Sequence, residues 1–192
     1  MYQLLTKYLR EKISLTNAQC ELIFSLFQPR MVNRNEIFFN KGMICQHFYF
    51  VNKGCIRMFY IHSDGTEFTR YFAFEKNFGT ALASFITQKP SLEYIQAIEK
   101  SEVLSILRND FYQLLEIIPS LEKIYRHILE NAHDINSQRI ESLLGKNAKD
   151  RYLSLLQQNP EIFQRIPNKL VASYLGISPE TLSRAKAQVQ IY

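Results

Sequence analysis

The chain of 192 residues is 46% hydrophobic and 21% charged, with six glycines and six prolines. This composition lies near the globular average and excludes collagenous, low-complexity and disordered chains, and the length suffices for one ordinary domain or two small ones. No apolar run approaches the ~18 residues of a membrane span, and the first residues lack the basic-then-apolar order of a signal peptide. We therefore expect a cytoplasmic protein without a membrane partner.

Positive charge is concentrated near the end of the chain. The net charge is +5, and the segment from Ser137 to Tyr192 holds eight basic and four acidic residues, so +4 of that charge lies there. A cationic module joined to a nearly neutral one indicates a polyanionic partner, although a solvated basic face without function would have the same charge.

The metal-binding residue types are scattered. Cys20, Cys45 and Cys55 form no C-x-x-C pair, and His47 and His62 are isolated from one another. Metal sites need clustered ligands at short spacings. We therefore expect reduced thiols, no metal site and no cofactor.

Strand-like segments fill the middle of the chain. They are rich in Phe, Tyr, Ile and Val and are separated by turns containing Gly or Asn, which predicts a compact antiparallel barrel or roll. The predicted strands are Phe48–Val51, Cys55–Ile61, Glu67–Phe72, Ile95–Ile98 and Val103–Ile106. Apolar residues at helical spacing predict two short helices before the strands, between Met1 and Phe27.

Helical patterns follow the strands. They predict helices at Phe111–Ile118, Pro119–Gly145, Ala148–Gln157, Lys169–Leu175 and Pro179–Val189. The long helix has a stripe spaced by three and four residues, which is typical of a two-stranded coiled coil with one polar position. The predicted dimer seam is Leu121, Ile124, Ile128, Asn131 and Ile135. The same stripe would equally serve a helix that packs on its own roll.

The most specific motif spans Asn168 to Arg184. Gly176 allows a sharp turn, Ser178 is a helix N-cap, and Pro179 occupies the first helical position, so a second helix begins there. The pattern predicts a helix-turn-helix whose second helix presents polar residues to the major groove of DNA. The predicted DNA-binding residues are Lys169, Ser178, Pro179, Glu180, Thr181, Ser183, Arg184 and Lys186. An ordinary helical hairpin is the alternative reading.

From Ala172 to Arg184 the sequence closely resembles the superfamily of bacterial transcription regulators named after the cyclic-AMP receptor protein and the fumarate-nitrate regulator (CRP/FNR). The glycines Gly42, Gly54, Gly65 and Gly79 also match the superfamily's turn pattern. The resemblance implies an α+β fold: a double-stranded β-roll of the cyclic-nucleotide-binding, jelly-roll type, a dimerisation helix and a winged-helix-like helix-turn-helix with a truncated wing. The expected domains are residues 1–118, 119–137 and 138–192.

The resemblance also locates an effector pocket in the roll, at Phe78, Gly79, Thr80, Ala81, Ser91 and Tyr94. Cyclic-nucleotide-binding members place a ribose-binding Glu after Phe-Gly and a phosphate-binding Arg downstream, but Thr80 and Ser91 stand at those positions here. The cysteine cluster of the iron–sulfur members is missing as well. We therefore expect an unknown small-molecule effector or none, and no response to cyclic nucleotides.

The resulting prediction is a non-catalytic, homodimeric regulator that binds a double-stranded DNA operator, with RNA polymerase as a further expected partner. Two alternatives stay open. One is a ligand-sensing or interaction module with a degenerate DNA-binding head, and the other is a metal-dependent enzyme of the cupin kind, which would share the roll.

Overall fold

The computed structural model describes residues 1–189, and these form two compact units. Residues 1–60 and 71–130 make the first unit, and residues 61–70 join the residues from Asn131 onward in the second. This division differs from the expected one at 118 and 137, because the long helix contributes to both units and the tip of one β-hairpin belongs with the C-terminal helices.

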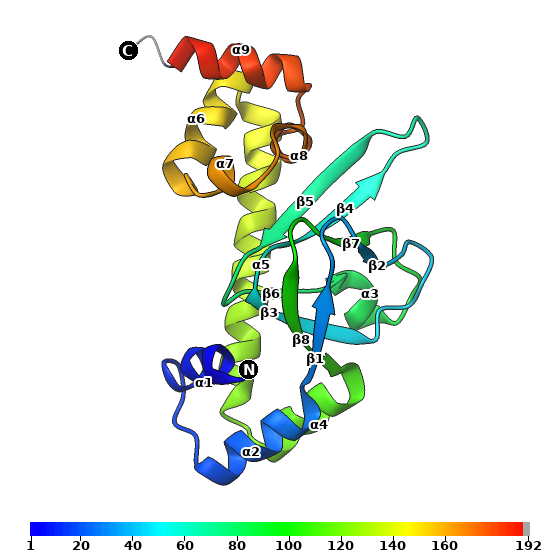
Figure 1. Cartoon of the computed structure of the whole chain (residues 1–192), viewed down its shortest axis with the longest axis vertical. Coiled ribbons are helices and arrows are strands. Elements are labelled where there is room, and N and C mark those ends of the chain that lie inside the picture. Colours follow the sequence, from blue (N-terminus) through cyan, green and yellow to red (C-terminus); the bar gives the residue numbers. More distant parts are fainter. Residues whose placement is uncertain (190–192) are drawn as a thin grey trace. The chain divides into compact units, whose positions relative to one another are not determined.

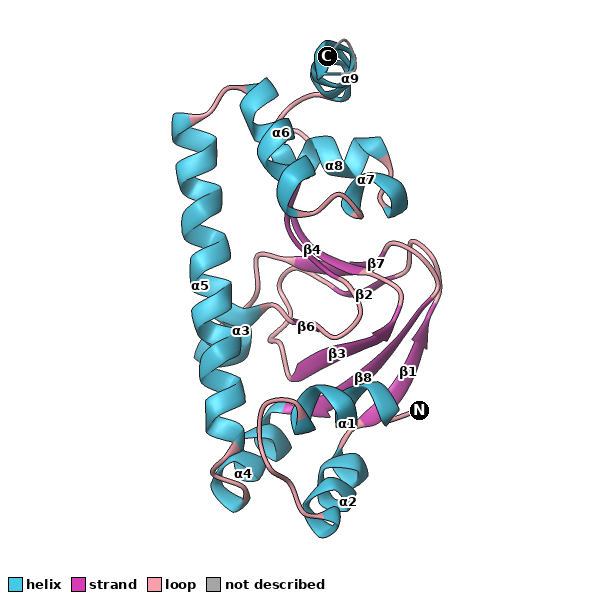
Figure 2. Ribbon diagram, turned by 90° about the vertical axis from the view of Figure 1, so that its left-hand side faces the viewer, coloured by secondary structure: helices cyan, strands magenta, loops and turns pink. Residues whose placement is uncertain are grey.

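The first unit is a β-roll made of two antiparallel sheets (Figure 1). One sheet has the order β1-β8-β3-β6 and the other β2-β7-β4-β5, and Figure 2 shows β1, β3 and β8 in one layer and β2, β4 and β7 in the other. The strands are β1 Gln28–Val32, β2 Ile37–Phe39, β3 His47–Lys53, β4 Ile56–Ile61, β5 Glu67–Ala73, β6 Phe78–Gly79, β7 Tyr94–Ala97 and β8 Ser101–Leu107. All five predicted strands are present, and the α+β fold class is confirmed.

Helices accompany this roll. They are α1 Gln3–Arg10, α2 Asn17–Leu26, α3 Leu82–Thr87 and α4 Arg108–Ile117. A complete capping box, in which Thr16 and Gln19 bond each other's backbone amides, fixes the start of α2. Helices α1 and α4 both pack against β3, where their aromatic rings contact Phe50 and Phe48 on the same face of the strand. The N-terminal helices were predicted, whereas α3 was not.

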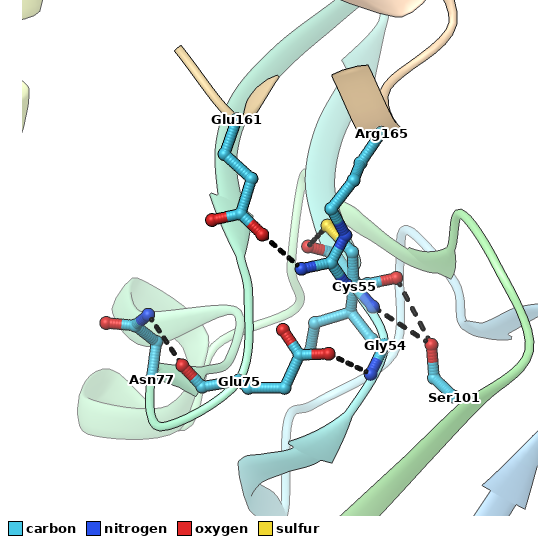
Figure 3. Close-up of polar contacts among 8 residues, drawn as sticks. Gly54, Cys55, Glu75, Asn77, Ser101, Glu161 and Arg165 are labelled. Carbon is cyan, nitrogen blue, oxygen red and sulfur yellow. Dashed lines mark hydrogen bonds and ion pairs between the residues drawn. The ribbon is translucent and has the colours of Figure 1, made fainter. Parts of the chain in front are cut away.

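Alternating side chains fill the interior of the roll. On β7, Ile95 and Ala97 are buried in the core while Tyr94 and Gln96 lie on the other face of the sheet. The three cysteines are free thiols, and all are buried. Polar contacts close the turns: Figure 3 shows the Glu75 carboxylate accepting a hydrogen bond from the Gly54 amide at 2.8 Å.

One predicted turn glycine has another role. Gly42, Gly54 and Gly65 have positive φ, but Gly79 lies within β6, and the left-handed residue of that turn is Lys76, at φ 65°. A Cβ atom on Gly79 would lie 2.9 Å from Cδ1 of Ile56. Gly79 therefore provides space for core side chains rather than a backbone turn.

The long helix α5, Leu121–Gly145, contributes to both units, and the second unit continues with α6 Ala148–Gln158, α7 Ile162–Arg165, α8 Asn168–Leu175 and α9 Pro179–Val189. Helices α6, α8 and α9 pack against one another. The core of this unit is Tyr152, Leu155, Ile162, Ile166, Val171, Ala172, Leu175, Leu182 and Ala185. Among residues 1–189, no helix is both long and apolar enough to cross a membrane.

Candidate functional site

Helices α8 and α9 form the predicted motif, and their connection has the expected geometry. Gly176 ends α8 with φ 64°, in the left-handed region that suits glycine. The Ser178 hydroxyl accepts a hydrogen bond from the backbone amide of Thr181 at 3.2 Å, so Ser178 caps the N-terminus of α9. This cap fixes where α9 begins and leaves its first turn at the surface.

The two faces of α9 differ sharply. Leu182 and Ala185 are buried against the other helices, whereas Glu180, Ser183 and Arg184 are exposed. Helical periodicity alone produces this separation, because positions three residues apart share a face. The helix therefore presents a carboxylate, a hydroxyl and a guanidinium on one continuous surface.

Local hydrogen bonds preorganise part of this surface. The Arg184 guanidinium donates to the Thr181 hydroxyl at 3.4 Å, and the Ser178 and Thr181 hydroxyls lie 3.1 Å apart. A hydrogen bond from Ser178, aided by the local backbone amide, lowers the pKa of Glu180. Glu180 is therefore ionised at neutral pH, as an acceptor from a base amino group requires.

The predicted cations are placed differently from one another. Lys169, on α8, is exposed, as is Lys149 on α6. Lys186 instead donates to the side chain of Asn168 at 2.6 Å, with its ammonium 5.4 Å from the centre of the Phe163 ring. Lys186 thus ties α9 to the start of α8, a role that spacing along the helix did not indicate.

Two further basic residues of the second unit form local bonds. Arg165 pairs with Glu161 one turn earlier, at 2.7 Å (Figure 3), and Lys146 donates to Ser154 at 2.7 Å. The predicted charge excess is therefore not evenly available to a partner. Its exposed components are Lys146, which bonds Ser154, together with Lys149, Lys169 and Arg184.

The expected effector residues are mostly internal to the roll. The Thr80 hydroxyl donates to the backbone carbonyl of His47 at 2.8 Å and lies 3.1 Å from Sγ of Cys45. The Ser91 hydroxyl accepts from the Glu93 amide at 2.9 Å. Both hydroxyls are therefore engaged within the protein, and both side chains are buried.

Two aromatic residues of the expected pocket, Phe78 and Tyr94, stack on other rings. Phe78 stacks on Phe48 with ring centres 4.9 Å apart, and Phe48 in turn stacks on Phe85 at 5.3 Å. Tyr94 stacks instead on Phe59, at 5.2 Å, on the face of β7 that points away from the core residue Ile95. Phe78, Gly79, Thr80 and Ala81 are consecutive in the chain. The Tyr94 ring belongs to the other sheet, where it lies on the face of β7 opposite to Ile95.

Ionisable groups of both signs lie near this region. Burial lowers the pKa of His47, and the nearby Arg30 guanidinium adds to the shift. The lowered pKa favours the neutral imidazole, so the nearby cation is Arg30 rather than His47. Glu93, two residues after Ser91, is buried as well. Within residues 1–189, no group of three or more His, Cys, Asp or Glu is arranged to hold a metal ion.

The start of the predicted dimer seam contacts the protein's own core. Leu121 and Ile124 are buried in the roll core, and Ile128 packs against it. Asn131 is exposed and Ile135 is half-buried. The helix-on-roll alternative therefore describes the first two turns of α5.

Comparisons with known proteins agree with this architecture. Residues 29–117 match the family model of the cyclic nucleotide-binding domain. The chain is 26% identical over 171 residues to a cyclic AMP receptor protein of Thermus thermophilus, a match that covers 86% of this chain and 78% of that protein.

Solved structures show the same fold. FixK2 of Bradyrhizobium japonicum superposes with a TM-score of 0.75 at 17% identity, covering 86% of this chain and 85% of that one. A regulator of the CRP/FNR family from Eubacterium rectale gives 0.72 at 20% identity, covering 92% and 84%. The chain thus has the fold of these solved regulators, and its residues 29–117 match a cyclic nucleotide-binding domain.

Proposed function

We propose that this protein is a homodimeric, sequence-specific DNA-binding transcription regulator that does not respond to cyclic nucleotides. The observation that carries the proposal is the surface of α9, where Glu180, Ser183 and Arg184 are exposed on a helix whose opposite face is buried. A helix in the major groove needs this division between packing and reading.

The residues of α9 have distinct roles in this proposal. Arg184 bonds guanine O6 and N7 with its two-pronged guanidinium, and Glu180 accepts from the cytosine amino group. Ser178, Thr181 and Ser183 supply hydroxyls to bases or phosphates, while Pro179 leaves no backbone donor at the first position. Lys169 contacts the phosphate backbone, which positions the head without selecting sequence.

Dimerisation through α5 would place two such heads about one helical turn apart on a roughly palindromic operator. Because Leu121 and Ile124 are taken up by the core, the partner contact involves later residues of the helix. Leu129, His133, Asn136 and Ile140 follow one another at spacings of four, three and four, and Ile140 is 58% exposed. This second stripe is a better candidate for the seam than the one predicted.

Cyclic nucleotides lack anchors in the roll. A cyclic phosphate is costly to desolvate unless a guanidinium or several amides receive it. Ser91 offers one hydroxyl that already bonds the Glu93 amide, and Thr80 offers one that already bonds the His47 carbonyl. An uncharged effector, or none, fits this apolar interior better.

The test is selection of bound duplexes from a random DNA library by the full-length protein, followed by affinity measurements at fixed salt. We expect one enriched, roughly two-fold-symmetric sequence. Arg184→Ala should weaken binding to it by about 1–3 kcal/mol while the fold is retained. Gln188→Ala, an exposed polar change one turn further along α9, serves as the matched control.

Failure to enrich any sequence would favour the alternative, an interaction module whose head no longer reads an operator. Enrichment with unchanged affinity of Arg184→Ala would keep the regulator and remove the role given to that arginine.

A further inference from the structure

The tip of the β4–β5 hairpin packs against the helix-turn-helix. Residues 61–70 belong to the same compact unit as α6 to α9, although the strands that carry them continue into the roll. The Thr69 amide donates to the Ser173 hydroxyl at 3.2 Å, and the two hydroxyls lie 2.6 Å apart. The Thr69 side chain is fully buried, so these bonds are shielded from water.

The neighbouring residue, Phe68, reaches the turn of the motif. Its ring carbon Cε1 lies 3.6 Å from the point that a Cβ atom on Gly176 would occupy. Nη1 of Arg151, on α6, lies 3.7 Å from the same point, and Cδ2 of Leu143, on α5, lies 2.9 Å from it. The hairpin, the end of the long helix and the first helix of the head therefore meet at the Gly176 turn.

This contact region includes an unsatisfied donor. Nε of Arg151 is buried and has no hydrogen-bond partner. Leaving a charged group's donor unpaired in a protein interior raises the free energy of that arrangement. The closed hairpin is thus stabilised by the two hydrogen bonds between Thr69 and Ser173, while the unsatisfied Nε of Arg151 beside it offsets part of that stabilisation.

Charge favours the open arrangement when DNA is bound. Ser173 and Lys169 are four residues apart on α8 and share a face of that helix. On the hairpin, the Asp64 carboxylate is exposed at the turn, whereas Glu67 and Arg70 are half-buried. Phosphates drawn to Lys169 would therefore approach the exposed Asp64 carboxylate of the closed hairpin, which is unfavourable.

We propose that the hairpin Ile61–Arg70 is an autoinhibitory latch that is closed on α8 in the free protein through Thr69 and Ser173 and is released when the head binds DNA. The proposal rests on the DNA-binding function proposed above. The free energy needed to open the hairpin then lowers the apparent affinity for the operator, because only the released state binds fully.

Hydrogen exchange at the Thr69 amide measures closure of the latch directly, because this amide donates its hydrogen bond to the Ser173 hydroxyl. Hydrogen exchange of the full-length protein should show slow exchange of this amide in the free wild type. Exchange should be faster in free Ser173→Ala, and faster again in the wild type bound to the selected operator. Equally slow exchange in the operator complex, or no change in free Ser173→Ala, would overturn the latch.

Affinity gives the second readout. Thr69→Val and Ser173→Ala should each raise operator affinity by about threefold to tenfold, the effect expected for one net hydrogen bond, and the double variant should gain no more than the larger single change. Ser63→Ala, an exposed hydroxyl deletion on the same hairpin, should leave affinity unchanged. Weaker binding by both latch variants would overturn the proposal. If the wild type binds no DNA, the proposed function fails, while exchange in the free proteins still tests the closed contact.

Discussion

Hydroxyl groups in the roll and in the head have opposite surroundings. In the roll, Thr80 and Ser91 are buried and bond to neighbouring backbone groups. In the head, Ser183 is exposed on a helix, beside Glu180 and Arg184. A hydroxyl that is already satisfied stabilises the fold, whereas one that faces water has bonding capacity left for a partner. The resemblance to one superfamily covers both regions, yet of these three hydroxyls only that of Ser183 is exposed.

The largest expected effect concerns the boundary between core and seam on α5. Ile140→Asp should dissociate the dimer, because it would place a charge in each copy of the proposed stripe, and the monomers should stay folded since Ile140 is exposed in the single chain. Sedimentation would measure this, with Gln138→Asp as the exposed control on the same helix. If Ile135→Asp dissociates the dimer and Ile140→Asp does not, the seam is the stripe predicted from the sequence, which ends at Ile135.

The next effect tests the roll. The missing charge-assisted pair and ribose hydrogen bond should cost about 3–5 kcal/mol, which moves a micromolar ligand to the millimolar range. Calorimetric titration of the dimer with cyclic AMP or cyclic GMP should show no saturable heat below about 1 mM. Low micromolar binding would mean that another cation receives the phosphate.

Packing of the head should matter more than its surface for stability. Leu182→Ala removes a buried side chain between the helices and should reduce the free energy of unfolding of the head by about 2–5 kcal/mol. Denaturant unfolding followed by circular dichroism would measure this. The neighbouring exposed change Ser183→Ala should be within ~0.5 kcal/mol of wild type, and equal losses from both would contradict the burial pattern.

The smallest effect is at the helix cap. Ser178→Ala leaves the Thr181 amide without its acceptor and should destabilise the head by about 1 kcal/mol. Ser178→Asp should retain the cap and most of the stability, yet it adds a negative charge beside Glu180 and should weaken operator binding. Unchanged binding by Ser178→Asp would show that the first turn of α9 lies away from phosphate.

Local sequence patterns predicted the elements that have local causes. The cap at Ser178 and the positive φ at Gly176 follow from residue chemistry within a few positions, and both are present. Strand β1 was missed because Pro29 argues against a central strand, and it proves to be an edge strand of its sheet. Strand β6, of two residues, and helix α3, of six, are too short to show a period.

Long-range contacts were beyond the sequence. Lys186 and Asn168 are 18 residues apart, and Thr69 and Ser173 are 104 apart. No periodicity relates such pairs, because only the packing of separate elements brings them together. For the same reason the sequence indicated an exposed Lys186, and it could not distinguish a stripe that packs on the roll from one that faces a partner.

The burial of every thiol has a practical consequence for observing the hairpin. Cys20, Cys45 and Cys55 have at most 5% of their surface exposed, so alkylating probes reach them slowly. A cysteine introduced at the exposed position Ser63 would therefore be labelled selectively, without removal of native residues. One fluorophore there and a quencher on the DNA would convert hairpin motion into an optical signal in the otherwise native chain.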